Sequence, residues 1–103
     1  MITANELIQV FSRNARLLCK RKGIKIGELE KSIGASQGYL ARMELNGGSP
    51  NLYKMYMTSK ALGVSIDDLL DWDLPAKLKV SELREELKSL VMTMKGENYG
   101  NDD

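Results

Sequence analysis

The chain has 103 residues, of which 43% are hydrophobic and 28% charged, and its net charge is +1; these values indicate one small globular domain with an appendage. With no histidine and one cysteine, Cys19, it lacks an internal disulfide, the usual zinc ligand sets and the usual histidine-dependent catalytic sites. No apolar run approaches the roughly 18 residues that span a bilayer, and the N-terminal residues lack a signal-peptide plan. We therefore expect a cytoplasmic protein that is not an enzyme and uses no metal or cofactor.

The charge is distributed unevenly. Residues 1–63 contain ten Lys and Arg against four Glu, a net +6, whereas residues 64–103 contain five basic and ten acidic residues, a net −5. A basic segment suits a phosphate-bearing partner, and an acidic segment disfavours lying on DNA. Two solvated surfaces of opposite sign are the alternative interpretation.

The first predicted helix begins at Ala4, because Thr3 and Glu6 have the spacing of a capping box. Apolar residues then recur three and four positions apart, and Gly23 follows the last helical residue. The basic residues 20–22 complement the helix dipole in the last turn, with a phosphate contact by one of them as the alternative.

Two short amphipathic helices are predicted next, over residues 26–33 and 36–45. Their apolar faces are defined by Leu29 and Ile33 in the first and by Leu40 and Met43 in the second. Gly34 suits the left-handed position that ends a helix, and the Ser36 hydroxyl can cap the next one. Two helices joined by a turn of about four residues form a helix-turn-helix, whose second helix is shaped for the DNA major groove.

A fourth helix is predicted after the turn at residues 46–48, with Ser49 as its cap and Pro50 at its first position. It is expected to bury Leu52, Met55 and Leu62 and to end at Gly63. Ser65 and Asp68 then begin a fifth helix, whose apolar residues complete a five-helix core.

Residues 71–75 indicate a boundary. Beyond it, Ser81 can cap a final amphipathic helix that reaches about Lys95, and residues 97–103 are predicted to be disordered. Its apolar seam consists of Leu83, Leu87, Leu90, Val91 and Met94. The helix either folds back on its own domain or pairs with the same helix of a second chain. We favour pairing, because a wide apolar stripe is unusual on a monomer and groove-reading domains need a two-fold dimer.

An ordered set of residues resembles the lambda-repressor-like, Cro/C1-type (XRE family) helix-turn-helix regulators. The set consists of Leu29, Gly34, Ser36, Tyr39, Leu40, Arg42, Met43, Glu44, Asn46, Gly47, Pro50 and the segment 60–70. The resemblance covers about residues 15–70 and implies an all-α fold, with a five-helix DNA-binding domain that we place over residues 1–73. The apolar seam adds a linker and a C-terminal amphipathic dimerisation helix over residues 74–96. It also implies a transcriptional repressor of bacterial or phage type that binds double-stranded DNA as a homodimer, with no membrane partner or small-molecule ligand evident.

Four positions depart from that family. Lys25 and Ile26 stand where a capping residue and a Gln that holds DNA backbone are common, so the second helix is expected to be poorly capped. Glu30 occupies a position usually held by a small residue, so either the helix crossing opens or the carboxylate tilts to the edge. Cys19 replaces a basic partner of Glu44, so we expect Glu44 to pair with Arg16 or to stay partly exposed, and Cys19 to fill core space.

The exposed face of the helix at 36–45 supplies the candidate base contacts, which are Gln37, Gly38, Ala41 and Arg42. Gln37 can bond an adenine edge through both groups of its amide, and Arg42 can reach guanine or a phosphate. Ala41 offers a contact to a thymine methyl group, and Gly38 a close approach of the backbone. The candidate phosphate contacts are Lys25, Gly27, Ser36, Tyr39, Ser49, Asn51 and Lys54. For Tyr39 a purely structural ring is equally consistent with the sequence.

A second function fits the same fold. The loss of the family's Gln at Ile26, the uncapped second helix and the acidic C-terminal half also suit a module that docks protein, such as an antirepressor or an antitoxin. Steep salt dependence of DNA binding would favour the DNA-binding regulator.

Overall fold

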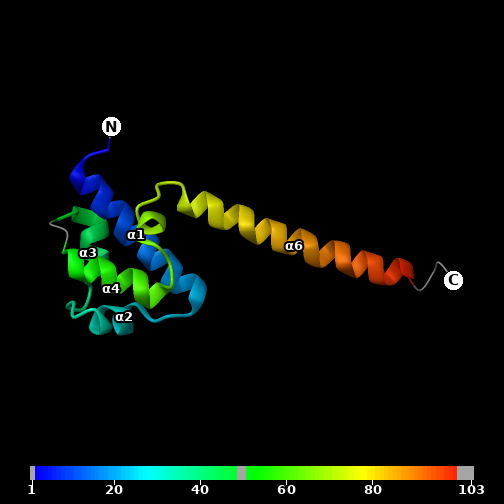
Figure 1. Cartoon of the computed structure of the whole chain (residues 1–103), viewed down its shortest axis with the longest axis horizontal. Helices are drawn as coiled ribbons and strands as arrows, with labels where there is room; N and C mark the ends of the chain where they lie inside the picture. Colours follow the sequence, from blue (N-terminus) through cyan, green and yellow to red (C-terminus); the bar gives the residue numbers. More distant parts are fainter. Residues whose placement is uncertain (1, 49–50, 100–103) are drawn as a thin grey trace.

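The computed structural model of the chain describes residues 2–48 and 51–99, with side chains described up to residue 95. Within these ranges it contains helices and no strand. The helices are α1 (Ala4–Lys22), α2 (Ile26–Ser32), α3 (Tyr39–Asn46), α4 (Leu52–Leu62), α5 (Ile66–Leu69) and α6 (Leu74–Tyr99). The first five pack together, and α6 projects from them as a long arm (Figure 1), so that the molecule measures 65 × 33 × 19 Å. None of the described helices is long and apolar enough to cross a membrane.

Helix α1 begins and ends where the sequence predicts. The Thr3 hydroxyl accepts a hydrogen bond from the Glu6 amide at 3.1 Å, and Gly23 adopts a left-handed φ of 70° at the other end, a conformation that glycine reaches without steric cost. The start of α5 is also where the sequence predicts it, and Ser65 and Asp68 form a complete capping box there.

The hydrophobic core surrounds α1, which contacts each of the other five helices. Its buried members are Phe11, Ala15, Leu18, Cys19, Leu29, Ile33, Leu40, Leu62, Leu69 and Leu74. Cys19 is fully buried, which confirms that it fills core space, and burial together with the nearby Glu30 charge raises the pKa of its thiol. Two polar residues of α1, Ser12 and Asn14, are buried as well.

The start of α4 differs from the prediction. The helix begins at Leu52, and its cap is Asn51, whose side chain accepts a hydrogen bond from the Lys54 amide at 3.0 Å. Leu52 is 76% exposed rather than buried, because a residue at the first helical position lies at the edge of the body. The predicted cap Ser49 and Pro50 lie outside the described residues.

The C-terminal helix is longer than predicted. It begins at Leu74, seven residues before the expected cap Ser81, and continues through Gly96 to Tyr99. The first turns are helical because Leu74 is buried in the core and Leu78 packs against it, while Pro75 near the start costs no hydrogen bond. Part of the predicted disordered tail is therefore helical, and residues 100–103 lie outside the described residues.

Candidate nucleic-acid interface

The helix-turn-helix consists of α2, a turn at residues 33–38, and α3. Gly34 has a positive φ of 75° and Gly38 one of 83°, so both ends of the turn use the left-handed conformation that favours glycine. Gly38, not Ser36, is the residue that precedes the first turn of α3, and its lack of a side chain means that the cap must come from elsewhere. The predicted Ser36 cap is therefore wrong.

The missing cap is supplied by Glu30 of α2. One carboxylate oxygen accepts from the Gly38 amide at 3.0 Å, and the other accepts from the Leu40 amide at 2.9 Å. Glu30 is only 2% exposed, so the expectation that its carboxylate tilts to the edge is wrong. A negative charge at a helix N-terminus satisfies amides that have no partner within the helix and interacts favourably with its dipole. Glu30 thus ties the two helices of the motif together.

The predicted base-reading residues divide into two groups. Gln37 and Gly38 lie in the turn before α3 rather than in its first helical turn, and Gln37 is exposed. Arg42, exposed on α3, folds back onto this turn and donates hydrogen bonds to the Gln37 carbonyl at 2.9 Å and to the Ser36 hydroxyl at 2.7 Å. Ser36, Gln37 and Arg42 therefore lie together and form one edge at the N-terminal end of α3. Ala41 is half-buried farther along the helix.

The residues predicted to contact phosphate are spread over α2, α3 and α4 and the segments before them. Lys54 of α4 and Tyr39 of α3 lie together, with the ammonium group 5.0 Å from the centre of the ring, and burial raises the pKa of the Tyr39 hydroxyl, which keeps it a neutral donor. Asn51 uses its side-chain oxygen to cap α4. Lys25 precedes α2 and makes no side-chain cap, which confirms the expected poor capping of that helix. Gly27 is exposed in the first turn of α2.

The family described as helix-turn-helix matches residues 16–69, more than half of the chain and the segment that contains α2, the turn and α3. The chain belongs to the Cro/C1-type helix-turn-helix family. The crystal structure of the clp gene regulator ClgR from Corynebacterium glutamicum is similar in fold, with a TM-score of 0.57 and 22% identity over 82% of this chain and 89% of that one. No curated protein matches the sequence.

In this helix-turn-helix protein, α1 holds the far end of α3 through contacts that sequence reasoning missed. The Gln9 side-chain amide donates to the Leu45 carbonyl at 2.8 Å, and the Asn5 oxygen accepts from the Gly48 amide at 3.4 Å. Arg16 pairs with Glu44, as expected. Asn5, Gln9 and Arg16 are spaced by four and seven residues, which places them on one face of a helix and was the available signal for this contact surface.

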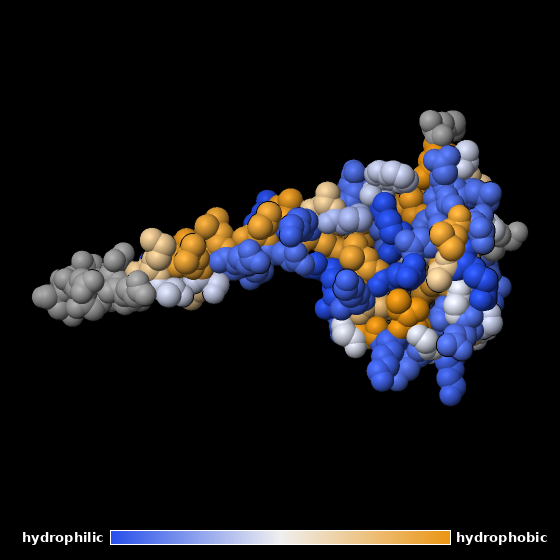
Figure 2. Space-filling view, turned by 180° about the vertical axis from the view of Figure 1, so that it is seen from behind, coloured by the Kyte–Doolittle hydropathy of each residue, from blue (hydrophilic) through white to orange (hydrophobic). Residues whose placement is uncertain are grey.

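The predicted dimerisation residues lie on the part of α6 that leaves the body. Every residue from Leu83 to Lys95 is exposed. The apolar seam members Leu83, Leu87, Leu90, Val91 and Met94 have exposed fractions between 39% and 61%. Apolar side chains are visible along this arm in Figure 2. A helix of this helix-turn-helix protein thus presents a continuous apolar stripe to solvent.

Proposed function

We propose that this protein is a sequence-specific DNA-binding transcription regulator, a repressor, that acts as a homodimer. The observation that carries the proposal is the edge formed by Gln37, Ser36 and Arg42 at the start of α3, in a helix-turn-helix held rigid by Glu30. This edge belongs to the segment 1–63 with a net charge of +6, which suits DNA phosphates. Repression then follows from occupation of promoter DNA.

Base readout is assigned to the start of α3. Gln37 is exposed, and its amide suits a bidentate contact with an adenine edge, the usual partner of a Gln amide. Arg42 exchanges its hydrogen bonds to the turn for a guanine edge or a phosphate. Ala41 contacts a thymine methyl group, and Gly38 allows the backbone to approach a base pair closely. A side chain at Gly38 would meet the Arg42 guanidinium at 3.0 Å, which also favours glycine there.

Phosphate binding is assigned to groups on α2, α3 and α4 and in the segments that precede these helices. The Lys54 ammonium and the Tyr39 hydroxyl form one group, supported by their contact in the structure. The main-chain amides at Asn51 and Gly27, near the first turns of α4 and α2, form another, because helix N-termini attract anions. Lys25, Ser36 and Ser49 complete the set.

We assign dimerisation to the exposed stripe of α6. Leu83, Leu87, Leu90 and Met94 are spaced by four, three and four residues, the spacing of a two-helix seam. Val80 and Val91 widen this seam. Burying these side chains against a second copy removes apolar surface from water, which is favourable. Residues 1–73 then form the DNA-binding domain and residues 74–96 the dimerisation segment, and two copies of α3 contact half-sites separated by about one helical turn, roughly 34 Å.

The test is selection of duplexes from a random DNA library with purified protein near physiological salt. Enrichment of a two-fold symmetric site supports the dimeric regulator and identifies its operator, and the affinity should fall steeply as salt rises. If folded protein enriches no sequence and binds DNA weakly at every salt concentration, the proposal is wrong. The protein-docking alternative, an antirepressor or an antitoxin, then becomes the better assignment, and a partner pull-down follows.

A further inference from the structure

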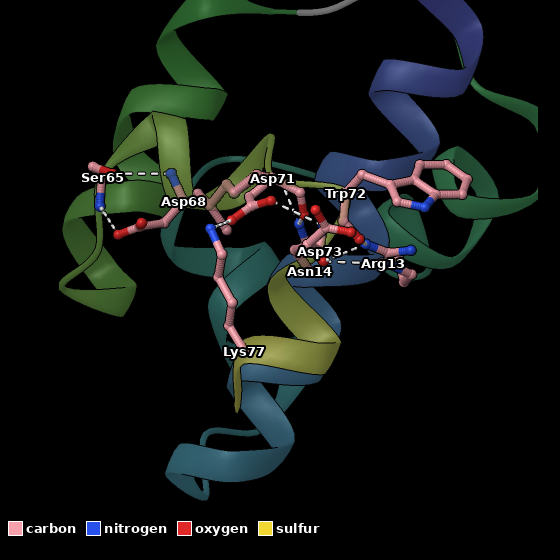
Figure 3. Close-up of polar contacts among 9 residues, drawn as sticks. Arg13, Asn14, Ser65, Asp68, Asp71, Trp72, Asp73 and Lys77 are labelled. Carbon is pink, nitrogen blue, oxygen red and sulfur yellow. Dashed lines mark hydrogen bonds and ion pairs between the residues drawn. The ribbon is translucent and has the colours of Figure 1, made fainter. Parts of the chain in front are cut away.

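The direction of the arm is fixed by polar side chains of α1 at its base. Asn14, fully buried, donates from its amide nitrogen to the Leu69 carbonyl at 2.9 Å and to the Asp71 carbonyl at 2.8 Å. The Leu69 carbonyl is the last of α5, where no helical donor remains. Asp71 lies two residues farther on, in the turn, and its carbonyl also accepts a hydrogen bond from the Leu74 amide at 3.2 Å. A single buried side chain therefore determines where the chain leaves α5 and turns toward α6 (Figure 3).

Arg13 adds a second constraint beside Asn14. Its guanidinium donates to the Asn14 side-chain oxygen at 3.0 Å and to the Trp72 carbonyl at 2.8 Å, and it lies 5.3 Å from the centre of the Trp72 ring. On the other side of the turn, Asp71 accepts from the Asp73 amide at 2.9 Å and pairs with Lys77 in the first turn of α6. The turn at residues 70–73 is thus held from both sides (Figure 3).

Arg21 makes the third contact, an ion pair with Glu82 of α6. Asn14 and Arg21 are seven residues apart, which places them on one face of α1, two turns from each other. Glu82 is also the last residue of α6 that is not fully exposed before the solvent-exposed segment begins. We call Arg13, Asn14 and Arg21 the arm latch.

The same helix holds α3 by other side chains, Gln9 to the Leu45 carbonyl and Arg16 to Glu44. Helix α1 is therefore the element that joins the DNA-reading helix to the arm. In a dimer formed by α6, the angle between the arm and α1 determines the separation and rotation of the two copies of α3.

We propose that the arm latch determines the spacing between DNA half-sites that the dimer accepts. This inference rests on the proposed function, because it requires DNA binding and dimerisation through α6. A latch that fixes the arm allows simultaneous engagement of two half-sites only at one separation, and a loosened arm allows several. Base preference within each half-site is set by α3 and is independent of the latch.

The experiment measures binding of the full chain to duplexes that carry two selected half-sites separated by a varied spacer. The test variant is Arg13→Met/Arg21→Met, which removes the guanidinium contacts and keeps apolar stems. The matched control is Lys20→Met/Lys22→Met, which removes two charges from the same helix. The side chain of neither lysine makes a hydrogen bond or ion pair with any residue that the structure describes. Asn14→Ala is a second test variant, and thermal unfolding establishes that each variant is folded.

For the wild type and the lysine control, we expect affinity to fall about tenfold or more when the spacer departs from the best length by half a helical turn, roughly 5 base pairs. For the latch variants, the same change should cost less than about threefold, with an unchanged sequence preference on a single half-site. If Arg13→Met/Arg21→Met keeps the wild-type spacer dependence, the latch proposal is wrong while the proposed function stands. If the wild type selects no DNA, the proposed function fails, and the latch proposal fails with it.

Discussion

The carboxylate of Glu30 in α2 accepts a hydrogen bond from the backbone amide of Leu40 in α3 at 2.9 Å. Its other oxygen accepts from the Gly38 amide, so one side chain caps α3 from the neighbouring helix. The two helices of the motif are joined here by a charged group where a small side chain would only allow close packing.

Replacing Glu30 with Ala should destabilise the protein by about 2–4 kcal/mol, because two amides at the start of α3 lose their acceptor in a buried site. Glu28→Ala is the matched control: the same residue type is exposed on the same helix, and its loss should change the free energy of unfolding by less than about 0.5 kcal/mol. Urea unfolding measures both. Equal urea midpoints for the two variants would show that the hydrogen bonds of Glu30 contribute nothing to the stability of the fold.

Gln37→Ala should relax the preference at one base pair of each half-site, at a cost of about 1–3 kcal/mol on the preferred sequence. Lys54→Ala is the comparison, since loss of a phosphate contact should weaken binding to all sequences alike and lower the slope of log affinity against log salt by about 1. Selection from a random library and binding titrations at several salt concentrations measure these effects. An unchanged selected sequence for Gln37→Ala would remove this residue from base readout.

Leu87→Lys should convert the dimer to a monomer, because it places a charge in the middle of the apolar seam. Met92→Lys is the matched control, since Met92 is also apolar and 72% exposed but lies five residues from Leu87 and so on the opposite face of α6. Sedimentation equilibrium measures the mass of each variant. A monomeric wild type, or two variants that dimerise equally, would contradict the assignment of the seam.

The free energy of unfolding should depend on pH in the acid range through Asp71, whose carboxylate pairs with Lys77 at the start of α6. The hydrogen bond from Lys77 and then that from the Asp73 amide lower the pKa of this carboxyl. A carboxyl with a lowered pKa in the folded state stabilises that state at pH values above its unfolded pKa, and the contribution is lost as pH falls through the folded pKa. The difference in stability between the wild type and Asp71→Asn should therefore shrink as pH falls from about 5 to about 2.5. Urea unfolding at several pH values measures this difference, and a constant difference would contradict the assignment.

The local signals in the sequence correctly predicted both ends of α1 and the start of α5. Thr3 with Glu6, Gly23, and Ser65 with Asp68 act within one or two turns of the chain, so their effect on the backbone can be recognised without knowledge of the packing. The apolar periodicity likewise identified the core positions of α2 and α3, which include Leu29 and Leu40. The interaction between Arg16 and Glu44 was one of two outcomes expected, because Cys19 stands where the family commonly has a basic partner and an unpaired buried carboxylate is costly.

Contacts between distant segments were decided only by the tertiary structure. Glu30 carries no sequence sign that its carboxylate will meet amides eight and ten residues later, and Asn14 carries none that it will bind carbonyls at the end of α5. The early start of α6 depends on burial of Leu74 against the body, which no local preference specifies. The sequence by itself determined the helices and the family, because capping and periodicity are short-range. The three-dimensional packing determined how α3 is capped and where the arm points, because those depend on partners that the chain brings together only on folding.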